Sequence, residues 1–85
     1  MSTKAKFVPR DAALAVALIL DAEKHRQEMT QGQLASAVGI SQPQVSHALR
    51  GLKPMTMTEM FRMCTALGLD ASDVVAQAQR QTLSR

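Results

Sequence analysis

Several polar side chains near the middle of the chain have the chemistry to hydrogen-bond to the edges of DNA base pairs. The amide of Gln42 or Gln44 could donate to and accept from adenine N6 and N7, and the guanidinium of Arg50 could bind guanine O6 and N7 or a phosphate. Pro43 lacks a backbone donor, so contact with a thymine methyl group is the role left to it. The candidate base-reading residues are Gln42, Pro43, Gln44, Ser46, His47 and Arg50. For Gln44 and Ser46, simple exposure to solvent is the alternative.

Hydroxyl groups and cations on both sides of this segment are candidates for contacts with the DNA phosphates. Those at its start and around the loop that follows it are Ser41, Lys53 and Thr56. A basic amino-terminal arm adds Lys4, Lys6 and, next to it, Arg10. This arm would either reach an adjacent groove or serve only as a solubilising tail.

The charges are distributed so that a polyanion could approach this part of the chain. The 85 residues contain 10 Lys and Arg against 7 Asp and Glu, which gives a formal net charge of +3. No acidic residue occurs from Met29 to Thr58, so every carboxylate side chain lies outside that stretch. Arg50 and Lys53 are its only formal positive charges, so the absence of repulsion matters more than attraction.

Other kinds of chemistry are excluded by the residue pattern. His25, His47 and Cys64 do not have the spacing of metal ligands, and no acid, base and nucleophile are grouped as in an active site. With no glycine-rich phosphate loop either, we expect neither an enzyme nor a cofactor. The longest apolar run, 12–20, is well short of the ~20 residues of a membrane span. A single cysteine is typical of a protein of the reducing cytoplasm.

The composition predicts one small all-α domain. Ala, Leu and Met are abundant and only 2 residues are aromatic, which favours helices over strands. Five helices are expected: 10–27, 31–38, 42–50, one capped by Thr56 and ended by Gly68, and one opened by Asp70 and Asp73. The expected organisation is an arm over 1–9, a compact five-helix bundle over 10–78 and a tail over 79–85.

Apolar spacing in the last two helices predicts which residues face the core. In the fourth helix the inward stripe is expected to be Met57, Met60, Phe61, Cys64 and Leu67. In the fifth it is expected to be Val74, Val75 and Ala78. Met55, in the preceding loop, could belong either to the core or to an adaptable binding surface.

The stretch from Gln31 to Gly51 has the spacing of two short helices that cross at a tight turn. Ala35 is small where the helices would touch, Gly39 permits the turn, and Ile40 and Val45 are spaced to fill the angle between them. Together with an LGL corner at 67–69, this stretch resembles the Cro- and repressor-type helix-turn-helix domains of phage and bacterial regulators. The resemblance covers Met29 to Val75.

The resemblance implies a lambda-repressor-like bundle whose third helix enters the major groove of double-stranded DNA as part of a transcriptional regulator. It also implies that Gln31 contacts a phosphate and braces the first base-reading glutamine. Three features depart from the usual pattern of the family: Gly32, Pro43 and an unusually apolar first helix.

The first predicted helix is more apolar than one small core requires. Its Leu14, Val16, Leu18, Ile19 and Leu20 cover more than one stripe, so a second buried face is expected. We interpret this face as the interface of a homodimer, helped by the fifth helix, that binds a palindromic operator as a repressor. The alternatives are an antitoxin, whose second face would hold a partner protein, and a protein-interaction adaptor or antirepressor that does not contact DNA.

Overall fold

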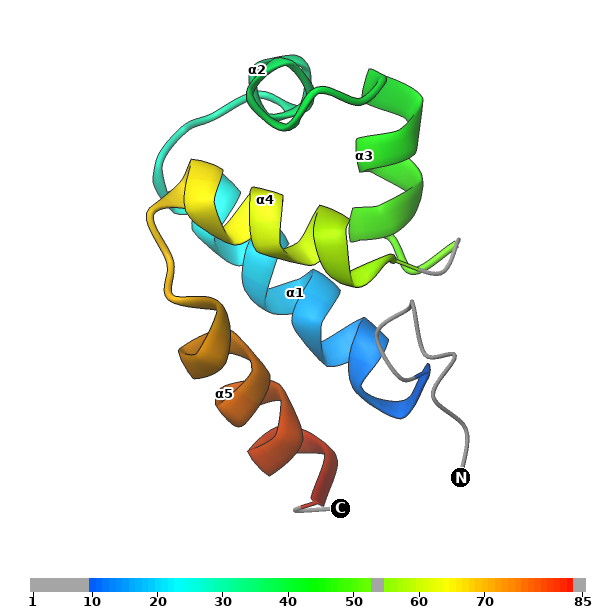
Figure 1. Cartoon of the computed structure of the whole chain (residues 1–85), viewed down its shortest axis with the longest axis vertical. Coiled ribbons are helices and arrows are strands. Elements are labelled where there is room, and N and C mark those ends of the chain that lie inside the picture. Colours follow the sequence, from blue (N-terminus) through cyan, green and yellow to red (C-terminus); the bar gives the residue numbers. More distant parts are fainter. Residues whose placement is uncertain (1–9, 53–54, 84–85) are drawn as a thin grey trace.

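The computed structural model describes residues 10–52 and 55–83, and it is built from five α-helices (Figure 1). They are α1 (Arg10–Arg26), α2 (Gln31–Val38), α3 (Gln42–Leu49), α4 (Met57–Leu67) and α5 (Ala71–Leu83). The predicted all-α, five-helix architecture is therefore confirmed. Three predicted phosphate contacts, Lys4, Lys6 and Lys53, lie outside the described residues, and for Arg10 the backbone alone is described.

Three helices begin with the same reciprocal cap. In α2, the Thr30 hydroxyl accepts from the Gln33 amide N–H at 3.0 Å, while the Gln33 side chain accepts from the Thr30 N–H at 2.8 Å. The equivalent pairs are Ser41 with Gln44 in α3 and Thr56 with Glu59 in α4. Each pair satisfies two backbone donors that a helix start leaves without partners, which fixes where these helices begin.

The ends of α1 to α4 also share one pattern. A residue with positive φ follows each helix, and the amide of the next, apolar residue donates back into the last turn. The positive-φ residues are Glu28, Gly39, Gly51 and Gly68, and the apolar residues that follow them are Met29, Ile40, Leu52 and Leu69. Three of these apolar residues pack against the core, but Leu52 is 61 % exposed. The end of α3 therefore leaves one apolar side chain uncovered.

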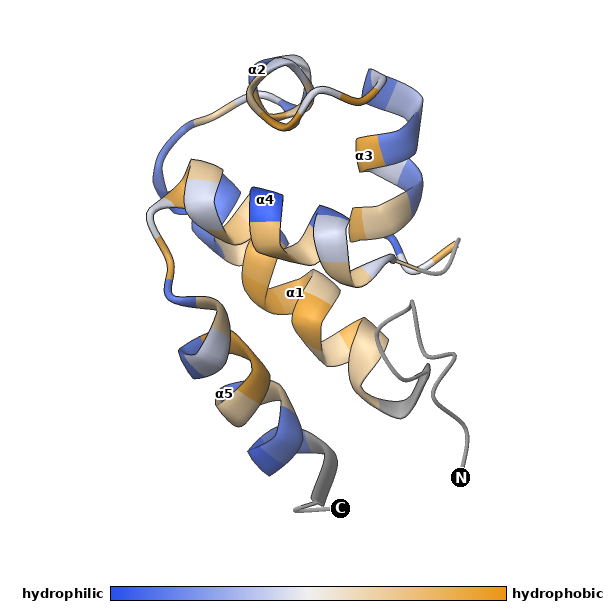
Figure 2. Ribbon diagram, viewed as in Figure 1, coloured by the Kyte–Doolittle hydropathy of each residue, from blue (hydrophilic) through white to orange (hydrophobic). Residues whose placement is uncertain are grey.

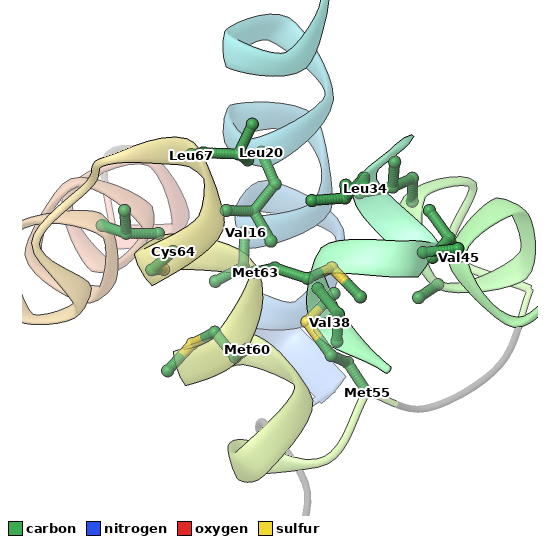
Figure 3. Close-up of a cluster of buried hydrophobic side chains, with 14 of the residues drawn as sticks. Val16, Leu20, Leu34, Val38, Val45, Met55, Met60, Met63, Cys64 and Leu67 are labelled. Carbon is green, nitrogen blue, oxygen red and sulfur yellow. The ribbon is translucent and has the colours of Figure 1, made fainter. Parts of the chain in front are cut away.

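The core is an apolar cluster to which every helix contributes (Figure 3). On α4 the fully inward residues are Met60, Met63, Cys64 and Leu67. The prediction that Phe61 faces the core is wrong, because Phe61 lies about 100° around the helix from Met60 and its ring is 49 % exposed. Met57 is only half-buried. Met55, for which two roles were open, belongs to the core.

Helix α5 packs mainly against α1 (Figure 1). Val74 and Ala78 are buried there, as predicted, whereas Val75 is 40 % exposed and was wrongly placed in the core. Val74 and Val75 are adjacent, and their sequence does not indicate which of the two faces inward. The helix continues to Leu83, so most of the stretch predicted as a tail from 79 onward is helical.

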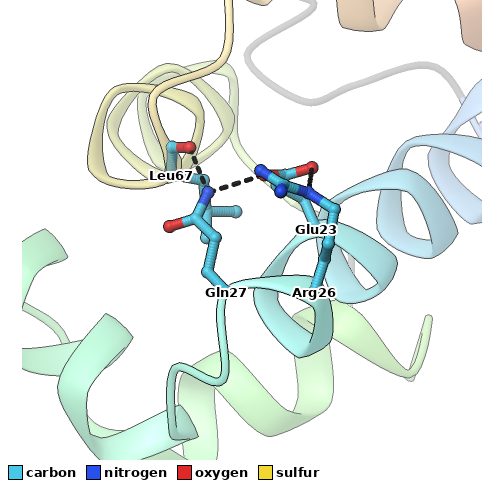
Figure 4. A network of polar contacts seen from close by, with 4 residues as sticks. All are labelled: Glu23, Arg26, Gln27 and Leu67. Carbon is cyan, nitrogen blue, oxygen red and sulfur yellow. Dashed lines mark hydrogen bonds and ion pairs between the residues drawn. The ribbon is translucent and has the colours of Figure 1, made fainter.

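A polar clamp joins the end of α1 to the end of α4 (Figure 4). The Gln27 amide donates to the Leu67 carbonyl at 2.6 Å and to Glu23 Oε2 at 2.7 Å, and Arg26 donates to the same carboxylate. Hydrogen bonds from Arg26, and then from Gln27, lower the pKa of Glu23 to about 2. The clamp supplies a partner to one of the carbonyls that the end of α4 leaves free.

Within the described ranges, no helix has the length and apolar character that crossing a membrane requires.

Candidate nucleic-acid interface

Helices α2 and α3 form the crossing pair that the sequence predicted. In Figure 1, α2 is seen end-on while α3 lies along the plane of the view, so the two axes cross steeply. Ala35 and Val45 are buried where the helices pack. Gly39 supports the turn with φ 85°, and Ile40 packs partly against the core. This is the arrangement of a helix-turn-helix unit.

The outward face of α3 and the Arg50 that caps its end carry the six predicted base-reading residues, and none of them is buried. Val45, Ala48 and Leu49 anchor the opposite face of the helix in the core. Four of the six are exposed: Gln42, Pro43, Gln44 and Arg50. The other two, Ser46 and His47, are half-buried. All six candidate side chains therefore lie at the surface of the domain.

Two of the predicted contact residues also cap α3. The Ser41 hydroxyl accepts from the Gln44 N–H at 3.2 Å, and Gln44 Oε1 accepts from the Ser41 N–H at 2.9 Å. A two-point contact with adenine needs both the oxygen and the nitrogen of the amide, so Gln44 would have to share its oxygen with the cap. Thr56, a predicted phosphate contact, similarly caps α4 through the Glu59 N–H at 3.0 Å.

Gly32 lies close to the Gln42 side chain, a proximity that the sequence did not reveal. The Gln42 side chain reaches back across the first turn of α2, where a β-carbon added to Gly32 would lie 3.4 Å from Gln42 Oε1. At that distance a β-carbon would make ordinary van der Waals contact with the Gln42 amide. Gln31, the expected phosphate contact and brace, is half-buried at the neighbouring position. The first turns of α2 and α3 thus meet at the Gln42 amide.

A family comparison decides the class to which this geometry belongs. A family model described as a helix-turn-helix domain matches residues 12–77. The chain belongs to this helix-turn-helix domain family. The match spans α1 to α4 and the first half of α5, which agrees with the resemblance seen in the sequence. The family is one of DNA-binding, non-enzymatic domains, as the lack of a grouped acid, base and nucleophile led us to expect.

Two solved structures have similar folds, and both are of the clp gene regulator ClgR from Corynebacterium glutamicum. The first is 25% identical, with a TM-score of 0.76, over 85% of this chain and 77% of that chain. The second is 26% identical, with a TM-score of 0.74, over 82% of this chain and 91% of that chain. A search of curated proteins finds no match. The helix-turn-helix domain is therefore similar in both sequence and fold to a gene regulator.

The charge pattern of the helix-turn-helix domain agrees with this class. Between Met29 and Thr58, the described residues include no carboxylate side chain, and Arg50 stands at the end of α3. The nearest acids along the chain are Glu28 and Glu59, and Glu59 is engaged in the cap of α4. The described residues contain no group of histidine, cysteine or acidic side chains that could hold a metal. Burial raises the pKa of the Cys64 thiol, as expected of a core residue rather than a nucleophile.

Proposed function

We propose that this helix-turn-helix protein is a sequence-specific transcriptional regulator that represses by occupying a palindromic operator. The observation that carries the proposal is the outward face of α3, which is accessible, polar and free of carboxylates. The likeness to a clp gene regulator supports a regulatory role. Because operator DNA is its ligand, the protein would act in the bacterial cytoplasm or nucleoid.

The proposed contacts fall into two classes. Base reading is assigned to the outward side chains of α3: Gln42, Pro43, Gln44, Ser46, His47 and Arg50. Phosphate contacts are assigned to a second set of residues: Gln31, Ser41, Lys53, Thr56, Lys4, Lys6 and Arg10. The first turn of α2 supports this division, because its free backbone N–H groups and partial positive charge favour an anion beside Gln31.

An uncovered apolar surface supports binding as a homodimer. Leu14 and Leu18 lie one turn apart on α1 and are 59 % and 65 % exposed, within an apolar stretch visible in Figure 2. Leu14 packs over Gly51, and Leu52, the residue that follows Gly51, is exposed as well. A patch of large aliphatic side chains is a liability on a monomer and suits a self-complementary interface. This patch adjoins the end of α3. Two copies that pair through it would therefore bring their α3 helices toward half-sites ~10 bp apart.

Selection from a random pool of DNA duplexes tests the function. We expect enrichment of an inverted repeat, and Gln42→Ala and Arg50→Ala should each relax the preference at one position per half-site. The matched control for Arg50→Ala is Arg80→Ala on the exposed side of α5. No preference for any duplex over random competitor at moderate ionic strength would refute the proposal and favour an adaptor.

Sedimentation tests the interface separately from DNA recognition. Leu18→Asn should shift the protein toward monomer and weaken binding to the full operator more than to a half-site. The control is Val75→Asn, which changes an exposed valine on α5. If α1 supplies the main contact, this variant should shift the protein toward monomer less than Leu18→Asn does. A wild-type monomer at high micromolar concentration, with and without DNA, would contradict the dimer.

A further inference from the structure

A groove between α2 and α4 is not used by the proposed DNA contacts. It has a volume of about 420 Å³. Its lining residues come from the second half of α2 and the outer face of α4: Ala37, Val38, Phe61, Arg62, Thr65 and Ala66. The alanines keep the two helices from filling the space between them. None of the six proposed base-reading residues lines this groove.

The groove is mostly apolar, and one cation, Arg62, is among its lining residues. Phe61 is the one aromatic residue in the described ranges, and half of its surface is exposed. The Thr65 hydroxyl is already engaged, because it donates to the Phe61 carbonyl at 3.0 Å. Arg62 donates a long bond of 3.5 Å to the Val38 carbonyl, and within the described part of the chain no carboxylate lies within ion-pair distance of it. Helix α2 has no charged residue to compete for this guanidinium.

We propose that this groove binds a segment of a partner protein that carries a large apolar side chain next to an Asp or Glu. The apolar side chain would cover the exposed face of Phe61, and the carboxylate would accept two parallel hydrogen bonds from Arg62. Aromatic residues and arginine are enriched in protein interfaces and contribute disproportionately to binding. The chain's own first nine residues fit poorly, because they contain Lys4 and Lys6 and no acid.

This inference goes beyond DNA recognition and does not depend on it. The base-reading side chains belong to α3, whereas the groove is formed by α2 and α4. A partner segment and a DNA duplex can therefore be tested on the same protein, alone and together.

The experiment is a selection of random 12-residue displayed peptides on the full chain, followed by NMR titration of the best peptide. We expect the selected peptides to place Leu, Ile, Met or Phe beside Asp or Glu, and to shift the resonances of Phe61, Arg62 and Ala66. Phe61→Ala should weaken binding about tenfold or more, the size of effect seen at interface hot spots. Ala37→Gln, at an exposed position that would project into the groove, should do the same without disturbing the core.

Charge reversal is the sharper arm of this experiment. Arg62→Glu should abolish binding of the acidic peptide, and the same peptide with Lys in place of its acid should bind that variant. Arg80→Glu on α5 makes the same change of charge outside the groove and should leave binding unchanged.

Five results would overturn the proposal, and the first four come from the selection and the titration. They are the absence of selected peptides, selection of peptides without acids, peptide shifts confined to α3, and concentration-dependent shifts at the groove without peptide, which would mean that a second copy occupies it. A fifth is that Arg62→Gln lowers DNA affinity and its dependence on salt, since Arg62 would then be a phosphate contact.

Discussion

The side chain of Leu14 lies over the α-carbon of Gly51, in the space that a β-carbon at that position would occupy. Leu14 Cγ is 3.5 Å from the position of that missing atom, and Leu14 Cδ2 is closer still. This contact joins the first turns of α1 to the end of α3. Gly51 also has φ 72°, a conformation that costs other residues energy. Gly39 has a similar φ of 85°, but nothing lies within 4 Å of its missing β-carbon.

We expect Gly51→Ala to destabilise the protein more than Gly39→Ala does. Both substitutions impose the left-handed backbone on an alanine, which costs about 1–2 kcal/mol, but only Gly51→Ala also forces Leu14 to move. Urea unfolding of the two variants measures the difference, which is the cost of displacing Leu14. Equal losses would show that Leu14 moves aside freely and that the contact does not define the α1–α3 junction.

Glu28 is the exception among the positive-φ residues that follow the helices. Its φ is 56°, whereas glycine stands at the three equivalent positions. We expect Glu28→Gly to raise the free energy of unfolding by up to about 1 kcal/mol, because relief of about 1–2 kcal/mol of left-handed strain exceeds the roughly 0.4–1 kcal/mol of added entropy in the unfolded chain. Thermal or urea unfolding measures the gain. Glu28→Ala removes the same charge but keeps a β-carbon, so a gain of equal size in that variant would attribute the effect to charge.

The helix boundaries were predictable because the chain marks both ends of most helices locally. A Ser or Thr followed three residues later by Gln or Glu marks the starts of α2, α3 and α4, and glycine marks the ends of the same helices. α1 ends at Arg26 with Glu28 rather than glycine at the positive-φ position that follows, and the prediction there was one residue too long. The helix-turn-helix pair and the accessible face of α3 followed from the same local signals.

The errors come from choices that depend on tertiary packing. Phe61 and Val75 stand beside residues that are truly buried, and periodicity does not show which of two adjacent apolar residues faces inward. The Gln42 side chain of α3 lies close to Gly32 of α2, and no local pattern encodes this proximity between two helices. The second role of Gln44, in contrast, was visible in the Ser41-x-x-Gln44 spacing, which marks a capping box as well as a reading face.

The lowered pKa of Glu23 predicts a specific dependence of stability on acid. Arg26 and Gln27 hold the pKa at about 2, below the usual 4.5, so the folded state binds this proton less readily than the unfolded state. The stabilisation is present above pH 4.5 and is lost as the pH falls toward 2. NMR titration should find the midpoint of Glu23 near 2 and a higher midpoint in Arg26→Ala. Unfolding of Glu23→Gln should depend less steeply on pH across this window, and an unchanged slope would contradict the clamp.

Gln44→Glu separates the capping role of this side chain from its proposed reading role. A glutamate can accept the Ser41 N–H just as Gln44 Oε1 does, and its negative charge suits the start of a helix. The free energy of unfolding should therefore stay within a few tenths of a kcal/mol of the wild type. The carboxylate cannot donate to a base or phosphate and would repel the DNA, so operator affinity should fall by about 1–3 kcal/mol.

Ser41→Ala supplies the opposite pattern and completes the test. It removes the hydroxyl that accepts the Gln44 N–H at 3.2 Å, so we expect a loss of about 1 kcal/mol in stability. DNA binding should weaken less than in Gln44→Glu and without a change in base preference, because Ser41 is assigned a phosphate. If Gln44→Glu instead binds the operator as well as the wild type, Gln44 only caps the helix. Base reading would then be done by the other outward residues of α3. Measuring unfolding and DNA binding for both variants therefore separates the capping role of Gln44 from its proposed base-reading role.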